Sequence, residues 1–255
     1  MGRIIAIANQ KGGVGKTTTC VNLAAGVAKK GKKTLLVDID AQGNATTGLG
    51  ISKSAGRSSV YKVLIGDISA KDAIIPTGTD NLFILPSSID LAGAEVELVN
   101  ERKRERRLAL ALDTVKDDYD FIFIDCPPAI GILTINALTS ADGVIIPIQS
   151  EYYALEGLSQ LMNTIKLVKK STNPKITIDG VVITMYDGRA LVSRQIRDEI
   201  IKFFGAKVFD AVIPRNIRVS EAPSYGIPVL DHDKKCRGTL GYLALTEEFL
   251  SRRFD

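Results

Sequence analysis

The sequence predicts an α/β fold, a doubly wound and mostly parallel β-sheet flanked by helices, as one domain over residues 1–255. Short runs dense in Ile, Val, Leu and Phe alternate with longer segments of helical character. These runs are almost continuously apolar, as expected of parallel strands that are covered on both faces. A chain of 255 residues with 45% hydrophobic content can bury a full core. No repeat, low-complexity tract or linker divides it.

The elements follow one another in the β-α-β order of a doubly wound sheet. Strands are expected at 3–9, 33–40, 81–87, 120–125, 143–149 and 176–184. Helices are expected at 16–30, 90–116, 153–170, 190–203 and 240–253. Right-handed crossovers between such strands bring their carboxyl ends to one edge of the sheet, where open α/β folds bind ligands.

Composition excludes several classes of protein. The three cysteines, Cys20, Cys126 and Cys236, lie far apart without a C-x-x-C pair, which argues against a zinc site or a disulfide framework. We expect reduced thiols and a cytoplasmic location, because no signal segment opens the chain and no apolar run could cross a bilayer. The net charge of +4 is compatible with a nucleic-acid partner but does not establish one.

The stretch ANQKGGVGKTT, residues 8–18, is similar to the phosphate-binding loop G-x-x-x-x-G-K-[ST], with two departures. Gln10 replaces the first glycine, and a second lysine, Lys11, follows it. An apolar strand precedes the loop and a helix follows, which disfavours the alternative of a glycine turn with incidental lysines. Glycines let the backbone curl around an anion, and the N–H groups of the helix N-terminus would face the phosphates.

Each residue of this loop therefore has an expected role toward ATP. Lys16 would reach the β- and γ-phosphates, and the Thr17 hydroxyl would bind Mg²⁺. The expected nucleotide-binding set is Lys11, Gly12, Gly13, Val14, Gly15, Lys16, Thr17 and Thr18.

Three aspartates end predicted strands and complete the expected site. Asp125 ends the run FIFID, as a Walker B acid that holds magnesium should. Asp38 and Asp40 share one face of their strand, because side chains alternate with a period of two. Asp40 is the candidate to orient the attacking water, and Asp38 to brace Lys16 or the magnesium waters. The alternative for this pair is a solvated end of a strand.

The motifs KGGVGKTT, DIDAQGN, DCPP, SEYYALEGL and IPRNIRVSEAPSYGIPV together resemble the ParA/MinD superfamily of deviant Walker A ATPases. The similarity covers essentially the whole chain and is strongest to the short ParA (Soj) branch, which partitions bacterial chromosomes. The resemblance implies an ATPase that forms an ATP-dependent homodimer, binds DNA and acts with a ParB-type partner. It also implies that Lys11 reaches across the dimer to the partner's nucleotide, where it would offset the repulsion between two buried triphosphates.

Further roles follow only from the resemblance. Arg189 and Arg218 match family arginines that bind double-stranded DNA without sequence preference, which implies association with the nucleoid. Pro214 and Asn216 match residues that frame adenine. The basic run 101–107, ERKRERR, is instead expected to be a solvated helix face.

One alternative function stays open, a membrane-cycling spatial regulator of the MinD type. Its relatives end in a basic amphipathic helix that binds lipid. Here Glu247 and Glu248 interrupt the apolar face of the last helix, and the basic content is low for membrane anchoring. We therefore expect no membrane partner.

Overall fold

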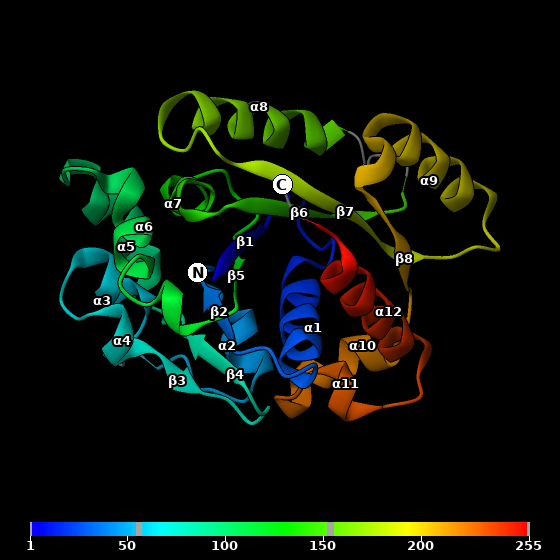
Figure 1. Ribbon diagram of the computed structural model, residues 1–255, viewed down its shortest axis with the longest axis horizontal. Coiled ribbons are helices and arrows are strands. Elements are labelled where there is room, and N and C mark those ends of the chain that lie inside the picture. The colour runs from blue at the N-terminus through cyan, green and yellow to red at the C-terminus, as the bar shows by residue number, and fades with distance from the viewer. Residues whose placement is uncertain (1, 55–57, 152–155, 254–255) are drawn as a thin grey trace.

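The computed structural model describes residues 2–54, 58–151 and 156–253, and its strands form one eight-stranded sheet (Figure 1). The strand order is β3-β4-β2-β5-β1-β6-β7-β8, and every neighbouring pair is parallel except β3 with β4. The strands are β1 (Arg3–Ile7), β2 (Thr34–Asp38), β3 (Ile75–Pro76), β4 (Leu82–Leu85), β5 (Phe121–Asp125), β6 (Gly143–Gln149), β7 (Thr177–Tyr186) and β8 (Val208–Pro214).

Helices cover both faces of the sheet, and each layer has its own apolar core (Figure 1). One layer contains α3 (Val60–Ile65), α4 (Ala70–Ala73), α5 (Leu91–Glu97), α6 (Arg107–Leu112), α7 (Ile132–Ser140), α8 (Glu156–Ser171) and α9 (Leu191–Phe204). The other contains α1 (Lys16–Lys29), α2 (Asn44–Gly48), α10 (Ile217–Glu221), α11 (Val229–His232) and α12 (Arg237–Ser251). The doubly wound, mostly parallel architecture is thus confirmed.

Strand β2 shows how the apolar runs serve both cores. Leu35 and Val37 pack in one core and Leu36 packs in the other. This alternation is the reason that the strand reads as a continuous apolar run rather than as a polar and apolar pattern. The register of β2 with β5 pairs Asp38 with Asp125, so both acids emerge at the same edge of the sheet.

All six expected strands are present, and two more were missed. β3 has two residues, and β8 is an edge strand with mixed burial, so neither gives a strong apolar signal. The helices expected at 16–30, 190–203 and 240–253 are confirmed as α1, α9 and α12. α8 is described from Glu156, so the expected start at 153 and the motif residues Tyr152–Leu155 lie outside the described residues.

The expectation of one helix over 90–116 is wrong. The segment is divided into α5, η1 (Leu98–Asn100), η2 (Arg104–Arg106) and α6, and Lys103 between the 3₁₀ turns has a left-handed φ of 56°. Asn136 of α7 stabilises this break, because its side chain accepts a hydrogen bond from the Leu108 N–H and donates one to the Arg104 carbonyl. The basic run 101–107 therefore lies on a turn and two short helices, not on one helix face.

The other helices that the sequence did not reveal are short or lack a clear amphipathic pattern. α2, α3, α4, α10 and α11 have four to six residues each, and α7 buries polar and apolar residues alike. Three further 3₁₀ turns lie among the described residues, η3 (Lys116–Asp118), η5 (Gly205–Lys207) and η6 (Ala222–Tyr225). Among the described helices, none has the length and apolar character needed to span a bilayer.

Gly180 allows edge strand β8 to dock on β7, because a Cβ at this position would overlap the ring of Phe209. Phe209 is buried, so the ring has little room to move. We expect Gly180→Ala to lower the free energy of unfolding by about 1–3 kcal/mol through overpacking. Urea unfolding monitored by circular dichroism measures this change.

The matched control is Gly78→Ala, where an added Cβ meets no atom within 4 Å. Its free energy of unfolding should stay within about 0.5 kcal/mol of the wild-type value, as for a neutral surface substitution. Equal midpoints for the two variants would show that the Gly180–Phe209 contact does not limit the docking of β8.

Candidate active site

The loop between β1 and α1 has the geometry of an anion cradle. Gly13 and Gly15 adopt positive φ values of 73° and 85°, which glycine reaches without steric cost. A Cβ added at Gly12 or Gly13 would meet no atom within 4 Å, so there is open space beside the backbone at both positions. Helix α1 begins at Lys16 with no side-chain cap and no acid in its first turn. Its first N–H groups are thus available to a phosphate.

Strand β7 contacts this loop directly, and the sequence did not predict this contact. Thr184 on β7 is buried, and its hydroxyl donates a hydrogen bond of 2.8 Å to the Val14 carbonyl. Its methyl group lies close to Gly15. In the sequence, Thr184 is visible only as a hydroxyl side chain within an apolar run. Its bond to Val14 could not be predicted, because it depends on the order of the strands in the sheet.

Lys16 turns back over the loop from the first residue of α1. The side chain is 7% exposed and its Nζ donates a hydrogen bond of 3.1 Å to the Lys11 carbonyl. Burial lowers the pKa of Lys16, and the carboxylates of Asp125 and Asp40 partly oppose this shift. An ammonium held across the mouth of the loop is well placed to meet the phosphates that the loop would hold.

Asp125, at the end of β5, is a fully buried acid. Neither carboxylate oxygen accepts a hydrogen bond from any described residue. Burial, followed by the negative charge of Asp38, raises its pKa well above the ordinary range. The Thr17 hydroxyl and the Lys16 ammonium favour the charged form, although Thr17 does not reach hydrogen-bond geometry. A buried carboxyl in this state is neutralised either by a proton or by a bound cation.

This donor set fits magnesium. Mg²⁺ prefers oxygen ligands and keeps several waters, so that proteins usually supply one or two ligands and the substrate phosphates supply others. Thr17 and Asp125 offer a hydroxyl and a carboxylate beside the phosphate cradle. Among the described residues no cluster of three or more His, Cys, Asp or Glu side chains could hold a metal, which excludes a cage made only of these side chains there.

Asp38 is fully buried but, unlike Asp125, has a complete set of donors. Its Oδ2 accepts bonds from the Thr46 N–H at 2.8 Å and the Thr46 hydroxyl at 2.7 Å, and its Oδ1 accepts one from the Asp40 N–H at 3.2 Å. Burial raises the pKa of Asp38 to about 6 although these donors lower it. Both oxygens are engaged by protein groups rather than by Lys16, and a contribution to the magnesium shell stays a prediction.

Asp40 lies two residues beyond, in the turn that leads to α2. It is 8% exposed, and its Oδ1 accepts a hydrogen bond of 2.9 Å from the Gln42 N–H. Its charge favours the charged form of Lys16, which shows that the two side chains share one electrostatic environment. The structure therefore brings Lys16, Asp38, Asp40 and Asp125 together at one edge of the sheet.

Lys11 lies at the rim of the cradle and is neither buried nor free in solvent. Its Nζ is 3.8 Å from the Glu151 carboxylate, and its N–H donates to the Asn9 side chain at 3.0 Å. Asn9 is itself anchored to the Pro147 carbonyl at the end of β6. The reach of Lys11 across to a second copy stays a prediction.

The predicted DNA-binding arginines lie on two exposed segments, and each arginine forms an ion pair with a nearby acid. Arg189 precedes α9, is almost fully exposed and pairs with Asp187 at 3.1 Å. Arg218 on α10 pairs with Glu221 at 2.9 Å and approaches Asp233 at 3.7 Å. Because these pairs are exposed, they are weak and can exchange partners.

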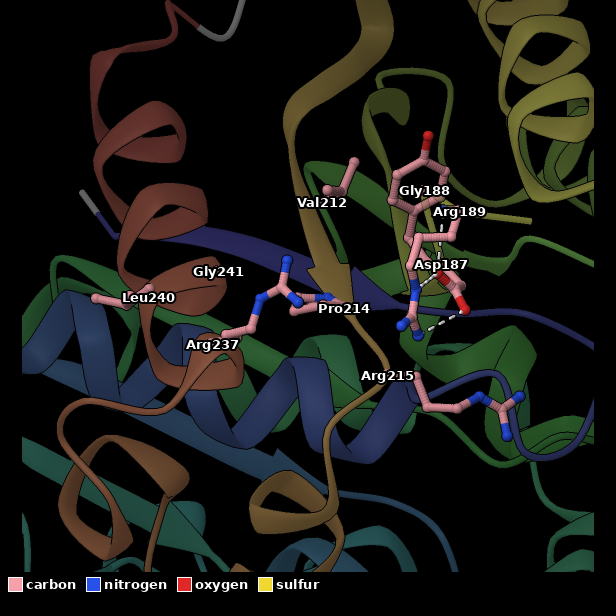
Figure 2. A pocket seen from close by; sticks show the side chains of 10 residues that line it. Asp187, Gly188, Arg189, Val212, Pro214, Arg215, Arg237, Leu240 and Gly241 are labelled. Atoms are coloured by element: carbon pink, nitrogen blue, oxygen red, sulfur yellow. Dashed lines mark hydrogen bonds and ion pairs between the residues drawn. The ribbon is translucent and has the colours of Figure 1, made fainter. Parts of the chain in front are cut away.

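Pro214 and Asn216, the predicted adenine residues, occupy different environments. Pro214 lines a hollow of about 690 Å³ between the β7–α9 loop and α12, where Figure 2 shows it between Arg215 and Arg237. Asn216 caps α10, because its side chain accepts a hydrogen bond of 2.9 Å from the Arg218 N–H. The cap is a local role that the sequence analysis did not consider, and the adenine contact stays a prediction.

Comparison with known proteins gives matches over the whole chain. Residues 2–178 match the family model described as AAA domain. The chain is 56% identical to the sporulation initiation inhibitor protein Soj of Bacillus subtilis, covering 97% of this chain and 98% of that protein. It is 50% identical to the chromosome partitioning protein ParA of Caulobacter vibrioides, covering 99% and 96%.

Solved structures agree on the fold. Cobyrinic acid a,c-diamide synthase from Mycobacterium smegmatis, with bound ATP analog and magnesium, has a TM-score of 0.86 at 36% identity, covering 98% of this chain and 95% of that chain. The septum site-determining protein MinD of Pyrococcus horikoshii, complexed with Mg-ADP, has a TM-score of 0.79 at 28% identity, covering 97% and 96%. The MinD match is thus more distant than the partitioning proteins. With its deviant phosphate loop, its paired acids and these full-length matches, the chain belongs to the ParA/Soj family of ATPases.

Proposed function

We propose that this protein is a DNA-segregation ATPase that hydrolyses ATP to ADP and phosphate. Mg²⁺-ATP joins two copies into a homodimer, the dimer binds double-stranded DNA without sequence preference, and hydrolysis stimulated by a ParB-type partner releases it. The whole chain acts as one domain, in the cytoplasm and on the nucleoid. The observation that supports this proposal most strongly is the glycine loop beside the buried Asp125, whose carboxylate accepts no hydrogen bond from the part of the chain that the structure describes.

The nucleotide roles follow from this geometry. The loop from Lys11 to Thr18 holds the phosphates, Thr17 and Asp125 hold Mg²⁺, and Lys16 donates to the terminal phosphates. Bound magnesium supplies neutralisation of the charge that develops on the phosphates. Asp40 orients the attacking water. Relatives with bound nucleotide and magnesium support the ligand class.

Lys11 makes dimerisation conditional on nucleotide. Two triphosphates brought face to face repel each other strongly where water is excluded. A lysine lent by each copy to the other's nucleotide offsets this charge, and it has an anionic target only when nucleotide is bound. Lys11 is half-buried, but Glu151 is exposed and their separation of 3.8 Å is long for an ion pair, so Lys11 can leave it at little cost.

DNA binding follows from the dimer. Arg189 and Arg218 contact phosphates, and such contacts release counterions and weaken steeply with salt. One copy offers few of them, whereas two copies double the contact surface. Each arginine exchanges its acid partner for a DNA phosphate.

The alternative of a MinD-like membrane protein is less well supported. Helix α12 packs its apolar residues, among them Tyr242, Leu245 and Phe249, into the core beside α1. These side chains are not available to lipid. Co-sedimentation with liposomes and with plasmid, each with ATP and with ADP, separates the two functions.

Asp40→Ala should trap the ATP dimer. Removing the group that orients the water lowers the rate of phosphate release by about 100-fold or more, while the phosphate cradle and Lys11 remain. Light scattering should show a doubled molar mass that persists with ATP, and a phosphate-release assay measures the rate.

Asp80→Ala is the matched control, because Asp80 is an exposed acid just before β4, at the opposite edge of the sheet. It should turn over ATP as the wild type does. Rapid turnover by Asp40→Ala would remove the proposed role of Asp40.

Replacing Arg189 and Arg218 together by glutamate should abolish DNA binding while the ATP dimer forms normally. The substitutions turn two attractive phosphate contacts per copy into repulsive ones. The loss of DNA affinity should therefore be far larger than if the two charges were only removed. Plasmid co-sedimentation at several salt concentrations and light scattering measure the two properties separately.

Arg102→Glu paired with Lys103→Glu makes the same change in charge on the exposed turn before α6. This control should keep most of its DNA binding. If it loses as much, net charge rather than the two arginines governs the affinity, and if the arginine variant no longer dimerises, the proposed division of roles is incorrect.

A further inference from the structure

A closed ring of hydrogen bonds surrounds the backbone of Asp40. Thr46 on α2 donates both its N–H and its hydroxyl to Asp38. The same hydroxyl oxygen accepts a bond of 2.9 Å from the Ser87 N–H, and the Ser87 hydroxyl donates a bond of 2.8 Å to the Asp40 carbonyl. The Asp40 N–H donates to Asp38 and closes the ring.

The ring joins two strand ends that are far apart in the sequence. Asp38 ends β2, whereas Ser87 follows β4, the neighbour of β2 in the sheet. Both peptide groups that flank Asp40 are thereby held, one by Asp38 and the other by Ser87. The Gly43 N–H adds a second bond of 2.8 Å to the Asp40 carbonyl.

Every member of the ring is buried, with exposed fractions of 0% for Asp38 and Thr46, 2% for Ser87 and 8% for Asp40. A buried polar network whose members are all satisfied fixes a single geometry, because any rearrangement would leave a polar group unpaired. The Asp40 carboxylate, by contrast, has one hydrogen-bond donor among the described residues, the Gln42 N–H. The structure therefore fixes the backbone of Asp40 and leaves most of its carboxylate available.

We propose that Thr46 and Ser87 are positioning residues, which hold the Asp40 backbone so that its carboxylate meets the attacking water. This inference rests on the proposed role of Asp40 in ATP hydrolysis. Ser87 bonds to the Asp40 carbonyl directly, and Thr46 bonds to Asp38 and Ser87, so both act through the position of the Asp40 main chain. A displacement of about 1 Å in such a group can cost roughly 100-fold in rate, so an effect on turnover without an effect on nucleotide binding is expected.

Two substitutions test the ring from different sides. Thr46→Val removes the hydroxyl and keeps the shape and the N–H bond to Asp38, and Ser87→Ala removes only the bond to the Asp40 carbonyl. We expect each to lower kcat for ATP by about tenfold or more, with KM and the affinity for a non-hydrolysable ATP analogue within about twofold of wild type. Thr46→Ser, which retains the hydroxyl, should restore most of the rate.

Thr47→Val is the matched control, because the Thr47 hydroxyl bonds only within α2 and its own preceding turn. It should keep the wild-type kcat. A merely structural role would lower kcat and analogue affinity together, and would not distinguish Thr46→Val from Thr47→Val. If Thr46→Val does not fold, Ser87→Ala decides the question, because its change is smaller and leaves the Thr46 bonds intact.

Asp40→Ala, measured in the same assay, separates this inference from the proposed function. If Asp40→Ala stops turnover while Thr46→Val and Ser87→Ala keep wild-type kcat, the positioning inference alone is overturned. If Asp40→Ala itself turns over normally, the role of Asp40 is overturned and the inference falls with it. Loss of kcat in all three, with analogue affinity preserved, supports both.

Discussion

Two acids lie side by side at the ends of neighbouring strands in the interior of this protein, and the repulsion between their negative charges is the main electrostatic constraint on the site. The register of β2 and β5 places Asp38 opposite Asp125, and both side chains are fully buried. Charges of like sign in a medium of low dielectric repel strongly, and desolvation adds to the cost of charging each acid. Thr46 and the Asp40 N–H compensate Asp38. No described residue donates a hydrogen bond to Asp125, so a bound cation would offset the charge that the protein leaves uncompensated.

Most of the basic side chains in the proposed cycle form ion pairs with exposed acids. Lys11 lies beside Glu151, Arg189 beside Asp187, and Arg218 beside Glu221. Exposed pairs contribute little to stability and exchange easily. A phosphate of the partner's nucleotide or of DNA can therefore replace the acid beside each of these side chains at little cost in free energy. Lys16 differs because it is buried inside the loop, as a permanent part of the cradle should be.

Much of the fold and the chemistry of the loop could be predicted from the sequence, because both depend on local patterns. Apolar runs predicted the six main strands, and the strand, glycine turn and helix predicted the cradle. Contacts between distant segments could not be predicted. Thr184 supports Val14, Ser87 supports Asp40, and Asn136 caps the broken segment 90–116, and each depends on a strand order or helix packing that no local pattern encodes. Those same contacts determine how firmly the reactive groups are held.

Thermal unfolding of Asp125→Asn tests most directly whether the buried acid requires magnesium. The wild type should be stabilised more by a non-hydrolysable ATP analogue with Mg²⁺ than by the analogue with EDTA. Asp125→Asn should melt no lower than the wild type without ligand, because burial raises the pKa of Asp125 and so already disfavours the charge that the neutral amide removes. It should gain stability from the analogue and nothing further from Mg²⁺. A variant that melts lower without ligand and keeps the full magnesium increment would contradict the account.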